Sequence, residues 1–327
     1  MMVFLIALLV FCLLELVYFN LADHFNIIDK PNQRSSHSRI TLRGGGIIFP
    51  LAIAGGILIW QPNLYLLSLA VLFIAVISFL DDIMTISNRI RLLIHFIAVG
   101  MVLYLCKDTF VSFFGADYLL PVIVAAFILI IGVINAYNFM DGINGITVLY
   151  SLITVSSIFL AQESLQLHLL EKNIYNVVLA SLCVFGFFNL RKRAKAFSGD
   201  VGSIGVALLI AYLVLQLILQ TQHFRWILLL GVYGLDAVAT IFCRLVRGEN
   251  IFEAHRSHFY QYLANETKLT HVQVSLIYAF VQGFLNLSIL YANNYLQLGI
   301  FLILMIIYII LRLKMEGKAR LFVSYSI

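Results

Sequence analysis

Two adjacent carboxylates at the end of an apolar run are the first residues whose chemistry needs an explanation. Asp81 and Asp82 directly follow a run that ends at Leu80. Neighbouring carboxylates repel each other and are costly near a bilayer, so the default interpretation is functional. A metal ion, a cationic partner or a proton-transfer role would each account for the pair. The alternative is a solvated helix end.

A second polar stretch interrupts an apolar region that extends from residue 118 to residue 162. Its polar and flexible members are Asn135, Asn138, Asp141, Gly142, Asn144 and Gly145. Glycine lets the backbone approach a ligand closely, and amide and carboxylate oxygens are hard ligands that suit Mg²⁺. The stretch therefore predicts a break in the chain that binds a metal or another ligand. The alternative is a polar turn between two helices.

A third stretch, from Phe197 to Ser203, opens the next apolar run. We expect Asp200 or Ser203 to cap the start of this helix, where free backbone N–H groups attract phosphate. A basic run precedes it: Arg191, Lys192, Arg193 and Lys195. The pattern predicts an anion site, and the alternative is a basic run that only anchors the membrane topology.

Two loops combine basic residues with histidine or glycine. Residues 253–261 include His255, Arg256 and His258, a set that can ligate metal, transfer protons or bind phosphate. Residues 29–46 end in Arg43 and the glycines at 44–46, which allow close backbone approach. The alternative for the second loop is a flexible basic segment beside anionic lipid.

Three further charged residues complete the set. Arg89 and Arg91 come shortly after the Asp pair, and Asp236 lies inside an apolar run. A carboxylate within such a run is costly and needs a partner.

The composition shows what kind of protein must position these residues. Of 327 residues, 62% are hydrophobic and 11% are charged, whereas a soluble domain is nearer half apolar and a quarter charged. This indicates an integral membrane protein and excludes a nucleic-acid-binding protein, despite the net charge of +5. The four Cys are scattered in apolar runs, which excludes a secreted disulfide-rich module.

Apolar runs long enough to cross a bilayer as helices recur along the whole chain. We predict an all-α, multi-pass membrane protein with a single domain over residues 1–327 and about eleven transmembrane helices, with ten as the alternative. The runs are 1–22, 44–60, 64–80, 90–106, 118–138, 142–162, 173–190, 203–220, 225–243, 271–291 and 295–313. We expect the first to be a retained helix.

Basic residues predict the orientation in the membrane. Eighteen of the 21 Lys and Arg fall in 23–43, 89–91, 191–195, 244–270 and the tail from 312. Such enrichment marks the cytoplasmic side, so we expect the N-terminus outside and the C-terminus inside. All five polar clusters then lie on the cytoplasmic side. Hard metal ligands beside phosphate-binding groups favour metal-assisted chemistry on a phosphate compound, whereas a transporter would place ionisable residues near mid-bilayer.

In this order and on one membrane side, the motifs resemble those of the polyprenyl-phosphate N-acetylhexosamine-1-phosphate transferases, the MraY/WecA family (glycosyltransferase family 4). The resemblance runs from Asp29 to Gln261. Residues 34–37, 44–46 and 255–258 resemble the WbpL-like branch, which initiates O-antigen and similar surface polysaccharides. It implies a bacterial inner-membrane enzyme, in some members a homodimer, that transfers a sugar 1-phosphate from a UDP-N-acetylhexosamine to undecaprenyl phosphate and releases UMP.

The resemblance also implies roles for matching residues. Asp200 and Asn138 would bind Mg²⁺, with Mn²⁺ as an alternative, and Asp81 and Asp82 would lie near the lipid phosphate and metal. Phe197 would stack on uracil. The diphosphate and sugar would be bound by His255, Arg256 and His258. The remaining substrate-binding positions would be Arg43, Gly44, Gly45, Arg89, Arg91, Asn135, Asp141, Gly142, Asn144 and Asn189.

Three residues depart from the family pattern. Asn144 stands where Asp is usual, Leu42 where Pro is usual and Ser198 where Met is usual. These departures affect the nucleotide side, whereas Asp82, Asn138 and Asp200 are all present.

Two mechanistic alternatives stay open at this point. A general base offers little to a phosphate monoester that is already mostly dianionic at neutral pH, so we expect Asp81 and Asp82 mainly to organise metal and basic residues. A covalent phospho-Asp route is the competing mechanism. The rival function is a flippase for a polyprenol-linked sugar or another transporter.

Overall fold

The computed structural model describes residues 1–30, 39–84, 86–251, 253 and 255–323. The chain is almost entirely helical, with the predicted all-α architecture. In chain order the helices are α1 (Met2–His24), α2 (Ile48–Trp60), α3 (Tyr65–Ile83), α4 (Asn88–Leu105), α5 (Lys107–Phe114), α6 (Leu119–Met140), α7 (Ile146–Ser164), α8 (Lys172–Asn189), α9 (Gly199–Thr221), α10 (Gly231–Val246), α11 (Phe259–Glu266), α12 (His271–Tyr291) and α13 (Asn294–Phe322). Short 3-10 helices are η1 (Gly45–Ile47), η2 (Pro62–Leu64), η3 (Ala116–Tyr118) and η4 (Phe224–Leu230).

Each of the eleven predicted apolar runs contains a helix, but the helices differ in length and composition. Among the residues that the structure describes, nine helices are long and apolar enough to cross a membrane. The other two runs correspond to α2, which has 13 residues, and to α8, whose mean hydropathy is lowered by polar residues such as Asn173 and Asn176. Length and hydropathy therefore support a multi-pass membrane protein with nine clear spans.

Helix α9 is the centre of the bundle. It contacts α2, α3, α6 and α7. Every residue of its membrane-crossing stretch is buried, whereas 11% of the residues in the corresponding stretch of α13 and 28% of those in α1 are buried. A helix that is apolar on all sides must be surrounded either by lipid or by other helices. Here the other helices surround α9, and α1 and α13 face outward.

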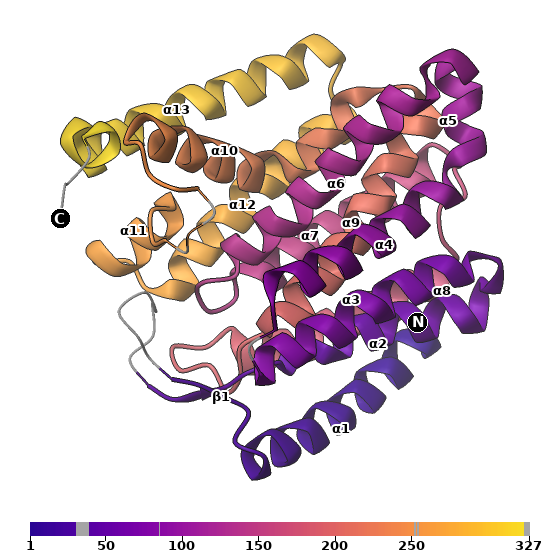
Figure 1. Ribbon diagram of the computed structural model, residues 1–327, viewed down its shortest axis with the longest axis horizontal. Coiled ribbons are helices and arrows are strands. Elements are labelled where there is room, and N and C mark those ends of the chain that lie inside the picture. Colours follow the sequence, from indigo (N-terminus) through magenta and orange to yellow (C-terminus); the bar gives the residue numbers. More distant parts are fainter. Residues whose placement is uncertain (31–38, 85, 252, 254, 324–327) are drawn as a thin grey trace.

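The loops that carry the predicted motifs gather at one end of the bundle. Figure 1 shows β1 (Ile28–Asp29) and α11 at this end and α5 at the opposite end. The strand β1 pairs antiparallel with β2 (Thr41–Leu42), and Leu42 forms a parallel bridge to Ala196 just before α9. Helix α1 begins and helix α13 ends toward opposite ends of the bundle (Figure 1), an arrangement that agrees with an odd number of crossings.

Two glycines, Gly46 and Gly202, let the glycine loop at residues 44–46 approach α9 closely. A Cβ atom on Gly46 would lie 2.5 Å from the Cα of Gly202, and one on Gly202 would lie 2.7 Å from the Cα of Gly46. Any larger residue at either position would separate the two backbones. The amide N–H groups of Gly45 and Gly46 donate to the carbonyls of Phe197 and Ser198, which fixes the loop against the start of α9.

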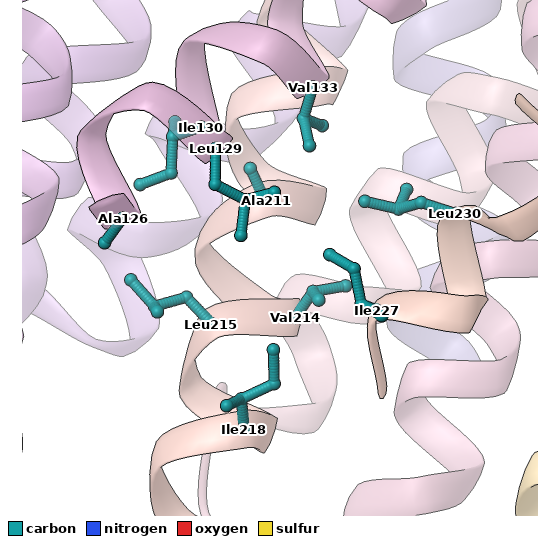
Figure 2. Close-up of a pocket in the computed structure, with 10 residues that line it drawn as sticks. All are labelled: Ala126, Leu129, Ile130, Val133, Ala211, Val214, Leu215, Ile218, Ile227 and Leu230. Carbon is teal, nitrogen blue, oxygen red and sulfur yellow. The ribbon is translucent and has the colours of Figure 1, made fainter. Parts of the chain in front are cut away.

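An apolar pocket lies between α6, α9 and η4, away from these loops. Figure 2 shows side chains of all three elements around it, among them Ile130, Val214 and Leu230. Its lining carries no ionisable side chain, so it contributes no acid, base or metal ligand.

Candidate functional site

Five charged side chains from four segments form one cluster, which we call the Asp–Arg cluster: Arg43, Asp81, Asp82, Arg91 and Asp200. Arg43 follows β2, the two adjacent Asp residues lie in the last turn of α3, Arg91 lies in the first turn of α4 and Asp200 lies in the first turn of α9. The structure thus brings together three of the five stretches that the sequence singled out.

Asp82 is the most buried member of the Asp–Arg cluster. Its side chain is 0% exposed, and it pairs with the Arg43 guanidinium at 2.7 Å. The solvated helix end considered above is therefore wrong for Asp82. Burial of a carboxylate requires this compensation, because an unpaired buried charge is strongly unfavourable.

Asp82 also corrects the predicted start of α9. The N-cap residue is Ser198, not Asp200 or Ser203, and its side chain makes no capping bond. Instead the N–H groups of Asp200 and Val201 donate to the Asp82 carboxylate at 3.2 and 3.3 Å. The donors that we expected to attract phosphate are thus occupied by a carboxylate from another helix, which the local sequence of α9 does not reveal.

Two arginines lie on either side of Asp200. Arg43 Nη2 is 3.7 Å from one carboxylate oxygen of Asp200, and Arg91 Nη1 is 3.8 Å from the other. Both distances exceed that of a hydrogen bond. Arg91 is bonded more tightly to Asp81, at 2.7 Å. Asp200 is thus attracted by two cations without being held by either, and its side chain is 18% exposed.

The charges also act on Arg43. Burial alone would lower the pKa of Arg43, but the carboxylates of Asp82 and Asp200 outweigh it and raise this pKa above its usual range. Each guanidinium has five N–H donors, so both arginines keep donors available for an anion.

Asp141 occupies the loop between α6 and α7 and is held by two hydroxyl groups. Thr147 Oγ1 donates to it at 2.7 Å, and Ser198 Oγ donates to its other oxygen. Burial raises the pKa of Asp141 to about 7, against the lowering effect of these two hydrogen bonds. Ser198, at the position where methionine is usual in the family, therefore has a definite partner here.

The predicted break at 135–145 is shorter than expected. Helix α6 continues to Met140, so Asn135 and Asn138 lie on its last turns, and the non-helical part is 141–145. Asn138 Nδ2 is 3.5 Å from Ser203 Oγ, one turn along α9 from Asp200. The predicted metal ligands Asn138 and Asp200 thus come from two adjoining helices.

Asn144 and Asn189 are buried and bonded to the backbone. Asn144 donates to the Arg191 carbonyl at 2.8 Å, a bond that the usual Asp could not donate. Asn189 accepts from Gly145 N–H at 2.7 Å and donates to the Ala196 carbonyl at 2.8 Å. Both amides tie the basic 190–196 loop to the start of α7. Their role in a nucleotide pocket stays a prediction.

The glycine loop and Phe197 frame the same region. Gly44 and Gly45 are buried against Tyr18, Phe79 and Phe185, and the half-buried Phe197 pairs with Leu42 through its backbone. Gly142 is packed against the Tyr260 ring. Arg89 is exposed, and residues 34–37 lie outside the described part of the chain.

The histidine loop, residues 253–261, lies beside the end of α6. The Phe139 ring is 6.0 Å from the His255 ring and 6.3 Å from the His258 ring. His255 and Arg256 are half-buried, whereas His258 is only 2% exposed. Burial, together with the charges of His258 and Arg244, lowers the pKa of His255 to about 3, which leaves it neutral at pH 7.

Sequence reasoning missed several residues that hold this end together. Thr147 donates to Asp141, Tyr260 donates to the Phe139 carbonyl at 2.8 Å, and Arg312 donates to the Ser257 carbonyl at 2.7 Å. A signal existed only for Arg312, a cation within a predicted span.

The geometry can be set beside known proteins. Residues 64–218 match the model of the family described as glycosyl transferase family 4. The chain is 25% identical to the "Probable undecaprenyl-phosphate N-acetylglucosaminyl 1-phosphate transferase" of Bacillus subtilis (strain 168), over 93% of this chain and 88% of that protein.

Two other relatives are similar over shorter regions. One is the "Undecaprenyl-phosphate alpha-N-acetylglucosaminyl 1-phosphate transferase" of Escherichia coli (strain K12), 29% identical over 73% of this chain and 69% of that protein. The other is the "Phospho-N-acetylmuramoyl-pentapeptide-transferase" of Carboxydothermus hydrogenoformans (strain ATCC BAA-161 / DSM 6008 / Z-2901), 27% identical over 73% of this chain and 83% of that protein.

Proposed function

Because the chain belongs to glycosyl transferase family 4, the family of MraY and WecA, we propose that it transfers an N-acetylhexosamine 1-phosphate from a UDP-sugar to undecaprenyl phosphate and releases UMP. The observation that carries this proposal is the Asp–Arg cluster, which combines carboxylates that can hold a metal ion with guanidinium groups that can bind phosphate. The site faces the cytoplasm of a bacterial inner membrane, with the N-terminus outside and the C-terminus inside.

Mg²⁺ is the proposed cofactor, with Mn²⁺ as an alternative. The described residues contain no group of three or more His, Cys, Asp or Glu arranged to hold a metal. Mg²⁺ does not require such a group, because it is commonly bound by one or two carboxylates together with substrate phosphates and water. Asp200 fits this requirement, because it is partly exposed and lies one helical turn from Ser203, to which Asn138 donates. When bound, the ion neutralises the diphosphate and the leaving UMP.

The two arginines balance the remaining charge. Phosphoryl transfer depends mainly on positioning and on stabilising negative charge. Arg43 and Arg91 lie on opposite sides of Asp200, so their free N–H groups can contact phosphate oxygens from two directions. Arg256 and the two histidines of the histidine loop would bind the diphosphate and sugar, and Phe197 would stack on the uracil.

Asp81 and Asp82 organise the site in this proposal and do not remove a proton. Both carboxylates are already engaged: Asp82 with Arg43 and the α9 N–H groups, and Asp81 with Arg91 and the Ile86 N–H at 3.0 Å. An organising role predicts that Asp82→Asn loses activity to the same extent between about pH 6 and 9. Recovery of activity toward the alkaline end would instead assign Asp82 as a general base.

The covalent alternative has its own test. A phospho-Asp intermediate predicts exchange of labelled UMP into the UDP-sugar when the lipid is omitted. The direct transfer that we favour predicts no exchange under these conditions.

The donor and the pathway are finer proposals. The likeness of residues 44–46 and 255–258 to the WbpL-like branch favours UDP-GlcNAc or a UDP-6-deoxy sugar, such as UDP-FucNAc or UDP-QuiNAc, and initiation of O-antigen or a similar surface polysaccharide.

The deciding experiment measures UMP release by the purified protein with undecaprenyl phosphate and a panel of UDP-N-acetylhexosamines, with and without Mg²⁺. We expect release with at least one donor, only in the presence of the divalent ion and the lipid. Absence of UMP release with every donor would contradict the enzyme and favour a flippase or another transporter.

A further inference from the structure

Asp236 on α10 is a fully buried carboxylate outside the Asp–Arg cluster, with 0% of its surface exposed. One oxygen accepts from Phe259 N–H at 3.0 Å and lies 3.3 Å from His258 Nδ1, while the other accepts from Tyr260 N–H at 3.2 Å and Tyr278 Oη at 2.5 Å. A group that accepts from so many donors acts as an ionised carboxylate. Three of these donors belong to one short segment, residues 258–260.

The carboxylate therefore supports the start of α11, whose N-cap residue is His258 and whose Gln261 Oε1 accepts from the His258 N–H at 3.3 Å. The N–H groups of Phe259 and Tyr260 are the first two of this helix, and an anion at a helix N-terminus is favourable. The carboxylate comes from α10, so it fixes where the helix begins relative to the bundle. Arg312, only 3% exposed, holds the other side of the segment through the Ser257 carbonyl at 2.7 Å.

The bond to Asp236 also determines how the His258 ring is presented. An ionised carboxylate can only accept, so this contact is a hydrogen bond in the ring form that carries a proton on Nδ1. The other ring nitrogen, Nε2, is buried and has no hydrogen-bond partner among the described residues. Unpaired buried polar atoms are rare and call for an explanation. The ring centre lies 5.0 Å from that of His255 and 6.3 Å from that of Phe139, near the end of α6.

Tyr260 connects the same anchor to the end of α6. Its backbone N–H is held by Asp236, and its hydroxyl donates to the Phe139 carbonyl at 2.8 Å. Phe139 directly follows the predicted metal ligand Asn138 and lies two residues before Asp141. One buried carboxylate thus sets the position of both His258 and Tyr260 beside the end of α6.

We infer that Asp236 is a positioning residue of the transferase: it holds the His258 ring beside His255 and Phe139 and keeps the histidine loop in register with the end of α6. This inference rests on the proposed function for its catalytic consequence, but the anchoring itself does not. Groups that orient a functional histidine typically change activity by about 10- to 100-fold when removed.

The test is a double-mutant cycle with Asp236→Asn, His258→Gln and the double variant, measured as UMP release at saturating Mg²⁺. We expect each single variant to lose about 100-fold in kcat. If Asp236 acts through His258, the kcat of the double variant is little lower than that of the less active single variant. Losses that multiply, or an Asp236→Asn variant within about threefold of the parent, would overturn the inference.

Tyr278→Phe is the matched control, because it removes a donor to Asp236 that does not belong to the histidine loop. We expect its kcat to stay within about threefold of the parent, because the contacts of residues 258–260 are intact. A loss as large as that of Asp236→Asn would mean that the cluster acts only through general stability.

Hydrogen–deuterium exchange of the full chain in detergent tests the anchor without relying on activity. Asp236→Asn should increase exchange in residues 255–266 and leave α9 unchanged. Unchanged exchange in 255–266 would overturn the inference whatever the activity. If exchange increases in Asp236→Asn but the parent protein releases no UMP, the anchor is retained and the proposed function is rejected.

If Asp236→Asn does not fold, Arg312→Lys serves as the second variant. It keeps the charge but removes the planar guanidinium that bonds the Ser257 carbonyl. The same rise of exchange in 255–266 is expected, and its absence counts against the anchor.

Discussion

Two groups of charged residues occupy the same end of this protein and are built in opposite ways. The Asp–Arg cluster is partly open: Asp200 is 18% exposed and lies 3.7 and 3.8 Å from two guanidinium groups. The second group, which we call the Asp236 cluster, comprises Asp236, His258, Tyr278, Arg312 and Glu316. It is closed, because Asp236 is 0% exposed and accepts several hydrogen bonds, and Arg312 pairs with Glu316 at 2.7 Å.

The difference indicates a division of labour between the two clusters. Carboxylates that are attracted by cations but not bonded to them keep lone pairs free for a metal or substrate. Carboxylates whose oxygens are fully used can only position their neighbours. We therefore expect changes in the Asp–Arg cluster to act mainly on chemistry, and changes in the Asp236 cluster to act on geometry and stability.

The largest effect is expected for Asp200→Asn. Loss of the proposed metal ligand should lower the rate of UMP release by on the order of 10³-fold, because charge stabilisation at the transferring phosphate is lost. The melting temperature in detergent should change little, since this side chain has no close ion pair. Asp23→Asn, at an exposed position near the end of α1, is the control. A large fall in melting temperature would place Asp200 with the structural carboxylates.

A large effect on stability is expected for Arg312→Met. The substitution removes the closer partner of the Glu316 carboxylate, leaving only Arg320 at 3.6 Å, and removes the bond to Ser257. Breaking a buried ion pair typically costs about 3–5 kcal/mol, so the melting temperature should fall by several degrees. The measurement is thermal unfolding in detergent. An unchanged melting temperature would show that the buried bonds of the Asp236 cluster contribute little to the stability of the protein.

A moderate, pH-dependent effect is expected at Asp141, which lies between the two clusters. Its pKa is raised to about 7 by burial, so the folded protein binds this proton more tightly than the unfolded chain. Its contribution to stability is then full below about pH 4 and is lost as the pH rises through about 7. Asp141→Asn cannot titrate, so the parent should lose stability relative to it between pH 5 and 8.

The measurement compares the melting temperatures of the parent and Asp141→Asn at both pH values. A difference between the two proteins that does not change with pH would contradict the raised pKa.

The smallest effect is expected for Arg89→Ala, with Arg91→Ala as its matched partner. Arg89 is exposed, whereas Arg91 bonds Asp81 at 2.7 Å. Exposed charges usually contribute little, so Arg89→Ala should stay within about twofold of the parent in UMP release. Arg91→Ala should lose at least about tenfold, because a charge-assisted bond and a cation proposed to contact phosphate are removed together. Equal losses would mean that Arg89 also contacts substrate.

The sequence predicted where the helices lie along the chain better than it predicted which helices pack against each other. Apolar runs locate helices because each must hide or satisfy its backbone in lipid, and every one of the eleven runs contains a helix. Hydropathy does not say that α9 is central, or that α2 has only 13 residues. Those facts depend on which helices pack together.

The candidate site shows the same limit. Asp81 and Asp82 were predicted from their cost near a membrane, and Asp200 from its place at a helix start and from the family resemblance; the structure brings all three together. The cap of α9 was not predictable, because Asp82 is 118 residues away in the chain. Asp236 was noticed as a carboxylate in an apolar run, but its partners at 258–260 and 278 come from other elements.

The complete enclosure of α9 has a consequence for how the protein responds to its bilayer. Lipid-facing helices such as α1 and α13 tilt or shift when the hydrocarbon thickness changes. Helix α9 has no lipid-exposed side along Val201–Leu219, so thickness cannot act on it directly. A change in thickness therefore reaches Asp200, at the first turn of α9, only through neighbouring helices such as α4, which carries Arg91.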